Sequence, residues 1–251
     1  MRDENAVVLA HLTDCARRAA RSGRIMFSNF LDPAQAEIAR QAAAIERVPV
    51  ELSGGHPDAE RTVAAFGWPD DEEIEWPIAI MEAAWDGRFA SCQHRDVLGS
   101  LMALGVEREC FGDIIIDSDN SRALLFALDR MEDFLTQNWI SAGRASLKVR
   151  RLTDAGAIPP PRGEMCRITV QSPRLDAVLA AALNLSRAEA QQTVRSGKVR
   201  VSFKECLNID KQLEPGDIVS VRGMGRFKLI EEQGRTRRDR LGFAIFKYEG
   251  K

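Results

Sequence analysis

The side chains of this chain that could do chemistry are mostly cations, and they gather towards one end. Residues 162–251 hold 18 Lys and Arg against 11 Asp and Glu, a net charge of +7, whereas residues 1–161 hold 17 against 26, a net charge of −9. Guanidinium and ammonium groups bind phosphate, so this asymmetry suggests a polyanion site confined to one end. Chance segregation of charge would give the same numbers, so charge alone does not decide.

Other reactive residues lack the pattern of a catalytic or metal site. The three histidines are far apart, and the five cysteines contain no Cys-x-x-Cys pair, which favours buried reduced thiols. The triplet His94-Arg95-Asp96 matches a kinase motif, but the other kinase motifs are absent, so the triplet is expected to start a helix that Asp96 caps or whose dipole it pairs with. The glycine pair at 223–225 precedes no helix and predicts a turn. We expect no catalytic residue, no metal and no cofactor.

The first segment, residues 1–73, predicts a mostly helical α+β domain. An amphipathic helix at 7–22 is followed by a second helix that Asp32 caps, with Pro33 at its first position. A short strand, a Gly-Gly turn and another short element follow, and the acidic run at 70–73 predicts a solvated linker. The residues expected on one face of the second helix are Ile38, Ala42 and Ile45.

The middle segment, residues 74–154, predicts the ferredoxin-like order β-α-β-β-α-β, an RNA-recognition-like fold. RNA-stacking versions of that fold carry aromatic residues on the central strands, whereas these strands offer Phe126 alone. We therefore expect a scaffold or a protein-contact surface, with an RNA platform as the alternative. The expected elements are strands at 77–85, 111–117, 122–128 and 145–152 and helices at 94–106 and 129–140. The proline-rich residues 155–164 predict a linker.

The last segment, residues 165–251, has dense local signals. A strand at 165–170 precedes a helix with Ser172 as its cap and Pro173 at its first position, and Ser186 opens a capping box for a second helix that ends at Gly197. A strand, a loop and a tight Pro-Gly-Asp turn into another strand follow. The whole chain is thus predicted to be a multidomain α+β protein.

Four motifs of this last segment resemble the S4 RNA-binding domain (αL-type). They are Arg-Leu-Asp at 174–176, Ser-Arg-x-Glu-Ala at 186–190, Ser-Gly-x-Val-x-Val at 196–201 and Pro-Gly-Asp-x-Val at 215–219. S4 domains often continue the third motif with Asn-Gly, which makes a two-residue turn. This sequence continues with Ser-Phe-Lys-Glu at 202–205, so we expect a longer or differently shaped loop there.

Three longer segments resemble the bacterial YlmH-like family. These are FLDPAQAEIA near the start, HRDVLGSLMALGVERECFGDIII in the middle and VRGMGRFKLI after the S4 motifs. The resemblance implies an N-terminal mixed domain, a central RNA-recognition-like domain and a C-terminal S4 domain. It also implies binding to ribosomal or transfer RNA and an association with the rescue of stalled large ribosomal subunits that carry peptidyl-tRNA. No enzyme activity follows from it.

Within the S4 resemblance, Arg174 and Arg187 open the two helices and are the favoured phosphate contacts. The alternative is that each only pairs with a neighbouring acid, such as Asp176 or Glu189. Arg187, Gln191 and Arg195 are one helical turn apart, and the predicted stripe extends to Lys198. Further RNA contacts are expected from Lys204, Arg222, Arg226 and Lys228, with a solvated surface as the alternative. The basic run at 235–240 is usually a solvated loop but would add affinity beside an RNA site.

The sequence thus predicts a non-catalytic RNA-binding factor whose partners are structured RNA and the large ribosomal subunit, with no DNA. An RNA-modifying enzyme that uses S4 for targeting is the alternative, but the synthetase, methyltransferase and pseudouridine synthase motifs are missing. A cell-division adaptor is a third hypothesis. No apolar run is long enough for a membrane span, and acidic residues stand where a signal peptide would be basic, so we expect a cytoplasmic protein.

Overall fold

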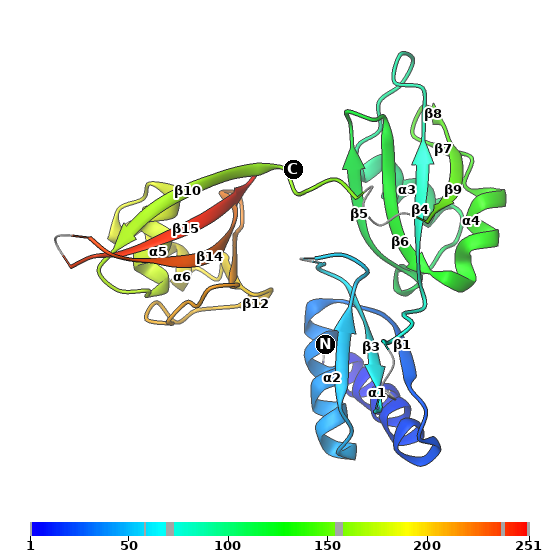
Figure 1. Ribbon diagram of the computed structural model, residues 1–251, viewed down its shortest axis with the longest axis horizontal. Coiled ribbons are helices and arrows are strands. Elements are labelled where there is room, and N and C mark those ends of the chain that lie inside the picture. The colour runs from blue at the N-terminus through cyan, green and yellow to red at the C-terminus, as the bar shows by residue number, and fades with distance from the viewer. Residues whose placement is uncertain (1, 58, 69–72, 154–157, 237–238, 250–251) are drawn as a thin grey trace. The chain divides into compact units, whose positions relative to one another are not determined.

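A computed structural model gives the fold as two compact units that divide between Pro159 and Pro160 (Figure 1). The predicted linker at 155–164 contains this division. The structure describes all residues except 1, 58, 69–72, 154–157, 237–238 and 250–251. Most of the acidic run predicted as a solvated linker at 70–73, and the residues at 154–157, therefore lie outside the described residues.

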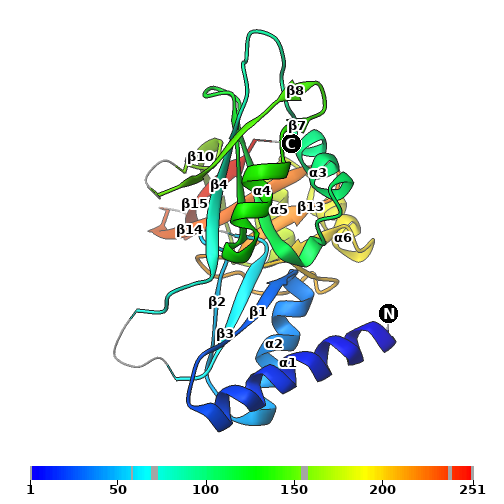
Figure 2. The same cartoon turned by 90° about the vertical axis from the view of Figure 1, so that its right-hand side faces the viewer.

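The N-terminal domain is a three-stranded antiparallel sheet with two helices on one face. The strand order is β1-β3-β2, and α1 and α2 lie side by side and pack their alanine-rich faces against it (Figure 2). The strand β1 was missed in the sequence, where only a helix was expected beyond residue 26. The elements are α1 (Arg2–Ser22), β1 (Met26–Leu31), α2 (Pro33–Glu46), β2 (Val50–Ser53) and β3 (Thr62–Phe66).

The start of α2 follows the prediction, but its buried face does not. Asp32 Oδ1 accepts from the N–H groups of residues 34 and 35, both at 2.8 Å, and completes a capping box. The residues that α2 buries are alanines, at 39, 42 and 43. Ile45 is 59% exposed, so the prediction that it shares one face with the buried Ala42 is wrong. Ile45 lies about a third of a turn from the centre of the face that these alanines form. The small alanine side chains let α2 pack close to α1.

The central domain has the predicted ferredoxin-like order. Its main sheet runs β5-β6-β4-β9, all antiparallel, and α3 and α4 pack on one face. Asp96 Oδ2 accepts from the Gln93 N–H at 2.9 Å, so it caps α3 as expected. The main elements are β4 (Ile78–Ala84), α3 (His94–Ala103), β5 (Phe111–Asp117), β6 (Arg122–Leu128), α4 (Glu132–Asn138) and β9 (Lys148–Leu152), with a small hairpin of β7 (Ser141–Ala142) and β8 (Ala145–Ser146).

The other face of this central sheet is partly covered by the N-terminal domain. Phe126 is fully buried there, in a cluster with Phe30 and Val63 of the N-terminal sheet. His56 stacks on Phe126 with ring centroids 4.4 Å apart and contacts the Asp113 carboxylate at 3.2 Å. Related RNA-recognition folds offer this face to bases. In this chain the one aromatic residue of the central strands therefore packs against protein.

The C-terminal domain is a six-stranded antiparallel sheet with both helices on one face (Figure 1). The strand order is β10-β15-β14-β13-β11-β12, and the core side chains come from the inner face of the sheet and from both helices. The elements are β10 (Gly163–Val170), α5 (Leu175–Leu183), α6 (Arg187–Arg195), β11 (Val199–Val201), β12 (Lys204–Glu205), β13 (Ile218–Val221), β14 (Gly225–Arg235) and β15 (Leu241–Tyr248).

The start of α5 differs from the prediction. Ser172 and Pro173 precede the helix, which begins at Leu175 with an extended Arg174 in the N-cap position and no side-chain cap. The physical reason is a backbone cap from another loop, because the Leu175 N–H donates to the Lys211 carbonyl at 2.8 Å. No Ser or Asp side chain is needed at this helix end.

The hairpin after β11 corrects a second expectation. Val201 pairs directly with Lys204, so the turn has two residues, Ser202 and Phe203, and is not longer than an Asn-Gly turn. Both have positive φ, 45° and 69°, as such a turn requires. Tertiary contacts hold these residues in that conformation, since Ser202 Oγ donates to Asp217 Oδ1 at 2.7 Å.

Candidate nucleic-acid interface

The carboxylate of Asp176 is fully buried and collects three of the predicted RNA-binding side chains. Arg187 Nη2 and Gln191 Nε2 each donate to Asp176 Oδ2 at 2.8 Å. Arg174 donates through Nε to Oδ1 and through Nη2 to Oδ2 of the same carboxylate, both at 3.2 Å. Residues from the starts of two helices are therefore held on one anion, and we call Asp176, Arg174, Arg187 and Gln191 the Asp176 cluster.

The cluster keeps its cations at the surface. The side chain of Arg174 is 34% exposed and that of Arg187 is 48% exposed, whereas that of Asp176 is not exposed at all. A guanidinium has five N–H donors, and the bonds to Asp176 use two from Arg174 and one from Arg187. Both arginines therefore pair with an acid, which was the alternative to phosphate contact. Each arginine still has N–H donors that do not bond to Asp176 and that are available to a phosphate.

The charge state of Asp176 follows from its surroundings. Burial alone would raise the pKa of the carboxyl group, but the hydrogen bonds from Arg174 and Gln191 and the charge of Arg187 outweigh it and hold the pKa below its usual range. The hydrogen bond to Asp176 raises the pKa of Arg174. At neutral pH the cluster therefore holds one anion and two cations.

The loop at 209–211 fixes the entrance to α5. The Asp176 N–H donates to the Ile209 carbonyl at 3.2 Å, and the Asp210 carboxylate forms an ion pair with Arg174. Arg174 is thereby held between a buried and an exposed carboxylate. Its position is set by a segment more than thirty residues further along the chain.

Helix α6 presents Arg187 and Gln191 because its first turn is capped as predicted. Ser186 Oγ accepts from the Glu189 N–H at 3.2 Å, and Glu189 Oε2 accepts from the Ser186 N–H at 2.8 Å. Glu189 is therefore occupied with the cap. Arg187 turns to Asp176 instead, and Gln191, one turn further along, reaches the same oxygen.

The predicted stripe continues past the end of α6. Arg195 is exposed in the last turn, and Lys198 is exposed after the left-handed Gly197, whose φ is 70°. The Arg222 N–H donates to the Lys198 carbonyl at 2.9 Å, so the exposed Arg222 of the β13–β14 turn lies next to Lys198. Three further predicted residues thus lie along one edge of the domain.

The remaining predicted residues lie apart from this edge. Arg226 and Lys228 alternate along β14 with Phe227 and Leu229, which are in the core under the helices, so both cations project from the opposite face of the sheet. Lys204 is exposed at the start of β12. The nine predicted residues therefore do not form one surface.

The basic run at 235–240 closes the β14–β15 hairpin and is partly neutralised. Arg235 forms an ion pair with Asp239 at 2.9 Å, and Arg240 Nη2 donates to the Thr169 carbonyl at 2.7 Å. Residues 237–238 lie outside the described residues. The expectation that this run contributes cations to RNA stays a prediction.

Asp176 belongs to the site, which the sequence did not predict. It stands in the Arg-Leu-Asp motif, where the sequence indicates only an acid that could neutralise its neighbour. The bonds from Arg187 and Gln191, 11 and 15 positions further along, depend on how the helices pack. An acid one residue into a helix gives no local sign that it is fully buried.

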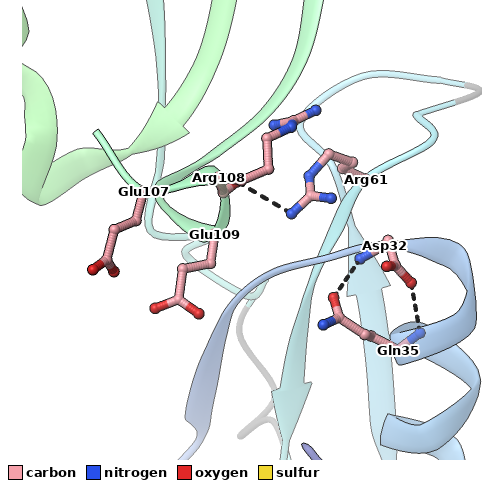
Figure 3. A pocket seen from close by; sticks show the side chains of 6 residues that line it. All are labelled: Asp32, Gln35, Arg61, Glu107, Arg108 and Glu109. Atoms are coloured by element: carbon pink, nitrogen blue, oxygen red, sulfur yellow. Dashed lines mark hydrogen bonds between the residues drawn. The ribbon is translucent and has the colours of Figure 1, made fainter. Parts of the chain in front are cut away.

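A concave surface lies between the N-terminal and central domains (Figure 3). It is a shallow pocket in which Arg61 Nη2 donates to the Arg108 carbonyl at 3.2 Å. Arg108 Nη1 donates to the Phe111 carbonyl at 2.8 Å, and burial together with the charge of Arg61 lowers the pKa of Arg108 to about 10. Both cations are thus turned to backbone oxygens, and Arg61 links the two domains through the carbonyls of Arg108 and Phe111. The lining residues are Asp32, Gln35, Arg61, Glu107, Arg108 and Glu109.

Two other kinds of site are missing from the described part of the chain. Its residues contain no group of three or more His, Cys, Asp or Glu side chains that would hold a metal ion. Nor does any helix among them have the length and apolar character to span a membrane.

Comparison with protein families accounts for all three domains. The model described as "YlmH, N-terminal" matches residues 4–70, and the one described as "Putative RNA-binding domain in YlmH" matches residues 69–155. The S4 domain model matches residues 173–219, which contain the Asp176 cluster.

Individual proteins agree with these matches. The chain is 32% identical over 222 residues to "Ribosome-associated protein quality control protein P2" of Bacillus subtilis (strain 168), across 86% of this chain and 85% of the relative. A solved structure, "Cell division protein ylmH from Streptococcus pneumoniae", superposes with a TM-score of 0.51 at 21% identity, over 62% of this chain and 95% of that one, and shows a shared fold. The identity and coverage of the Bacillus subtilis relative, with the domain models, establish that the chain belongs to the YlmH family of S4-domain proteins.

Proposed function

We propose that the chain binds structured RNA, ribosomal or transfer RNA, through the helical side of its C-terminal domain. The observation that carries this proposal is the Asp176 cluster, in which a buried carboxylate holds two half-exposed arginines at the starts of two helices. Arg195, Lys198 and Arg222 extend the row of cations. Cations held in fixed positions can match successive phosphates of a folded RNA, and they read its shape rather than its bases.

The proposed particle is the large ribosomal subunit, in ribosome quality control in the cytoplasm. The name of the Bacillus subtilis relative, which places that protein with ribosomes and quality control, supports this assignment. Binding to stalled subunits that carry peptidyl-tRNA would bring ribosomal and transfer RNA within reach of one protein. Sedimentation of the tagged protein with ribosomal particles, followed by crosslinking and sequencing of the bound RNA, tests it. Reads spread evenly over messenger RNA would contradict it.

The proposed activity is binding without catalysis. In the Asp176 cluster the buried carboxylate accepts hydrogen bonds from both arginines, and an arginine stays protonated at neutral pH, so neither arginine serves as a general base. The alternative is an RNA-modifying enzyme that uses the S4 domain for targeting. Incubation of the full protein with RNA and common cofactors, followed by nucleoside mass spectrometry, separates the two. A stoichiometric new modification would favour the enzyme.

A further inference from the structure

Within the described part of the C-terminal domain, α5 and α6 pack on one face of the sheet, and neither helix covers the other face. Phe227 and Ile245 point into the core under α5 and α6, so their alternating neighbours on β14 and β15 point the other way. The side chains that share this helix-free face include Arg200, Arg226, Lys228, Phe246 and Tyr248. It thus combines cations, among them also Arg167 of β10, with two aromatic rings, and the acid Glu205 stands across from Arg200.

At the centre of this face a cation lies over one aromatic ring, and a second ring meets that ring edge-on. The guanidinium carbon of Arg226 lies 4.2 Å from the centroid of the Tyr248 ring. The Phe246 ring meets the Tyr248 ring edge-on, with centroids 5.0 Å apart and an interplanar angle of 89°. Phe246 in turn lies against Gly163 of the edge strand β10, where a Cβ atom would stand 2.7 Å from a ring carbon. Arg226 therefore lies over the Tyr248 ring, which the Phe246 ring contacts from the side. All three side chains are half-buried.

This arrangement has the chemistry that recognises an unpaired nucleotide. Bases stack on aromatic rings and on the planes of arginine guanidinium groups, and nearby cations bind the flanking phosphates. Lys228 lies beside Phe246 across the strands, and the exposed Arg200 follows on β11. A positively charged face favours a polyanion over an apolar protein partner.

We propose that the helix-free face of the C-terminal sheet, centred on Arg226 and Tyr248, binds an unpaired base of the RNA. The base would stack on the Arg226–Tyr248 pair while Lys228 binds an adjacent phosphate. This inference rests on the proposed function, and it adds a second site to the Asp176 cluster, on the other side of the sheet. The protein then distinguishes RNAs that carry single-stranded segments from fully paired ones.

Two RNA hairpins with the same stem test the second site on the full chain. One carries a single-stranded extension with 2-aminopurine, whose fluorescence changes when the base stacks, and the other is blunt. We expect the wild-type protein to change the fluorescence of the extension and to bind the extended hairpin about tenfold more tightly than the blunt one, as one stacked base allows. Tyr248→Leu and Arg226→Lys should both remove the fluorescence change and the tenfold preference, while affinity for the blunt hairpin stays within about twofold.

The matched control is Arg167→Lys. Arg167 is exposed on the same face, but its partner across the strands is Ala244 rather than an aromatic residue, so this variant should behave as wild type. If both site variants keep the fluorescence change, or if they lose affinity for the two hairpins equally, the second site is wrong. Binding of the blunt hairpin without any fluorescence change of the extension would overturn the second site alone. Binding of neither hairpin by wild-type protein would overturn the proposed function as well.

Discussion

Arg187 Nη2 lies 2.8 Å from Oδ2 of Asp176, a carboxylate with no exposed surface. The side chain of Arg187 is about half exposed, so one partner of this ion pair lies in the interior of the domain and the other lies at its surface. The same contact therefore serves stability and, in the proposed function, presents a cation to RNA. Four variants and one change of pH separate these two roles.

Replacing Arg174 and Arg187 together with Ala should destabilise the C-terminal domain by about 2–4 kcal/mol, because it leaves a buried carboxylate without either cation. Urea unfolding followed by circular dichroism measures the loss. Adding Asp176→Asn should restore part of it, since the uncompensated charge is then gone. A double variant as stable as wild type would show that the Asp176 cluster does not contribute to folding.

Asp176→Asn alone should weaken RNA binding about fivefold or more, although it raises the net charge of residues 162–251 from +7 to +8. If charge alone determined affinity, the variant would bind more tightly. If Asp176 instead positions Arg174 and Arg187, losing the anion lets both side chains move away from the phosphates. Fluorescence anisotropy with an rRNA hairpin at fixed salt decides between the two. Tighter binding by a folded variant would contradict a positioning role.

The depressed pKa of Asp176 predicts how stability depends on pH. A carboxyl group whose pKa is lower in the folded state stabilises the fold above its unfolded pKa of about 3.9, and the contribution is lost as the pH falls through the folded value. The fragment 160–251 should therefore keep the contribution of Asp176 to its unfolding free energy from about pH 7 to 5 and lose that contribution below about pH 4. In Asp176→Asn this acid loss should be smaller. If the wild-type fragment and Asp176→Asn lose stability equally as the pH falls, other acidic residues cause the loss.

The fragment 160–251 should also bind structured RNA by itself. It is a compact unit with its own hydrophobic core, and it carries the basic excess of the chain. All four tryptophans lie in the first unit, so tryptophan fluorescence reports the folding of fragment 1–159 separately. Filter binding compares the two fragments on one hairpin. Equal or stronger binding by fragment 1–159 would contradict the assignment of the main RNA site to the C-terminal unit.

What could be predicted from the sequence was local in origin. The capping boxes at Asp32 and Ser186 and the ferredoxin-like order of the central strands follow from signals within a few residues. The predictions failed where distant segments decide the structure. The loop at 209–211 caps α5 in place of Ser172, and Asp217 helps to hold the tight turn at Ser202. The grouping around Asp176 depends on helix packing in the same way.

The salt dependence of RNA binding tests the central claim most directly. Arg195 and Lys198 extend the proposed RNA-binding edge and are exposed, so replacing both with Ala should change stability by no more than about 0.5 kcal/mol. Each lost phosphate contact lowers the slope of log affinity against log salt by about 0.7–0.9. The account predicts a slope about 1.5 units smaller in magnitude for the double variant, with an unchanged melting temperature and weaker binding to every structured RNA. A folded double variant with the wild-type slope would contradict it.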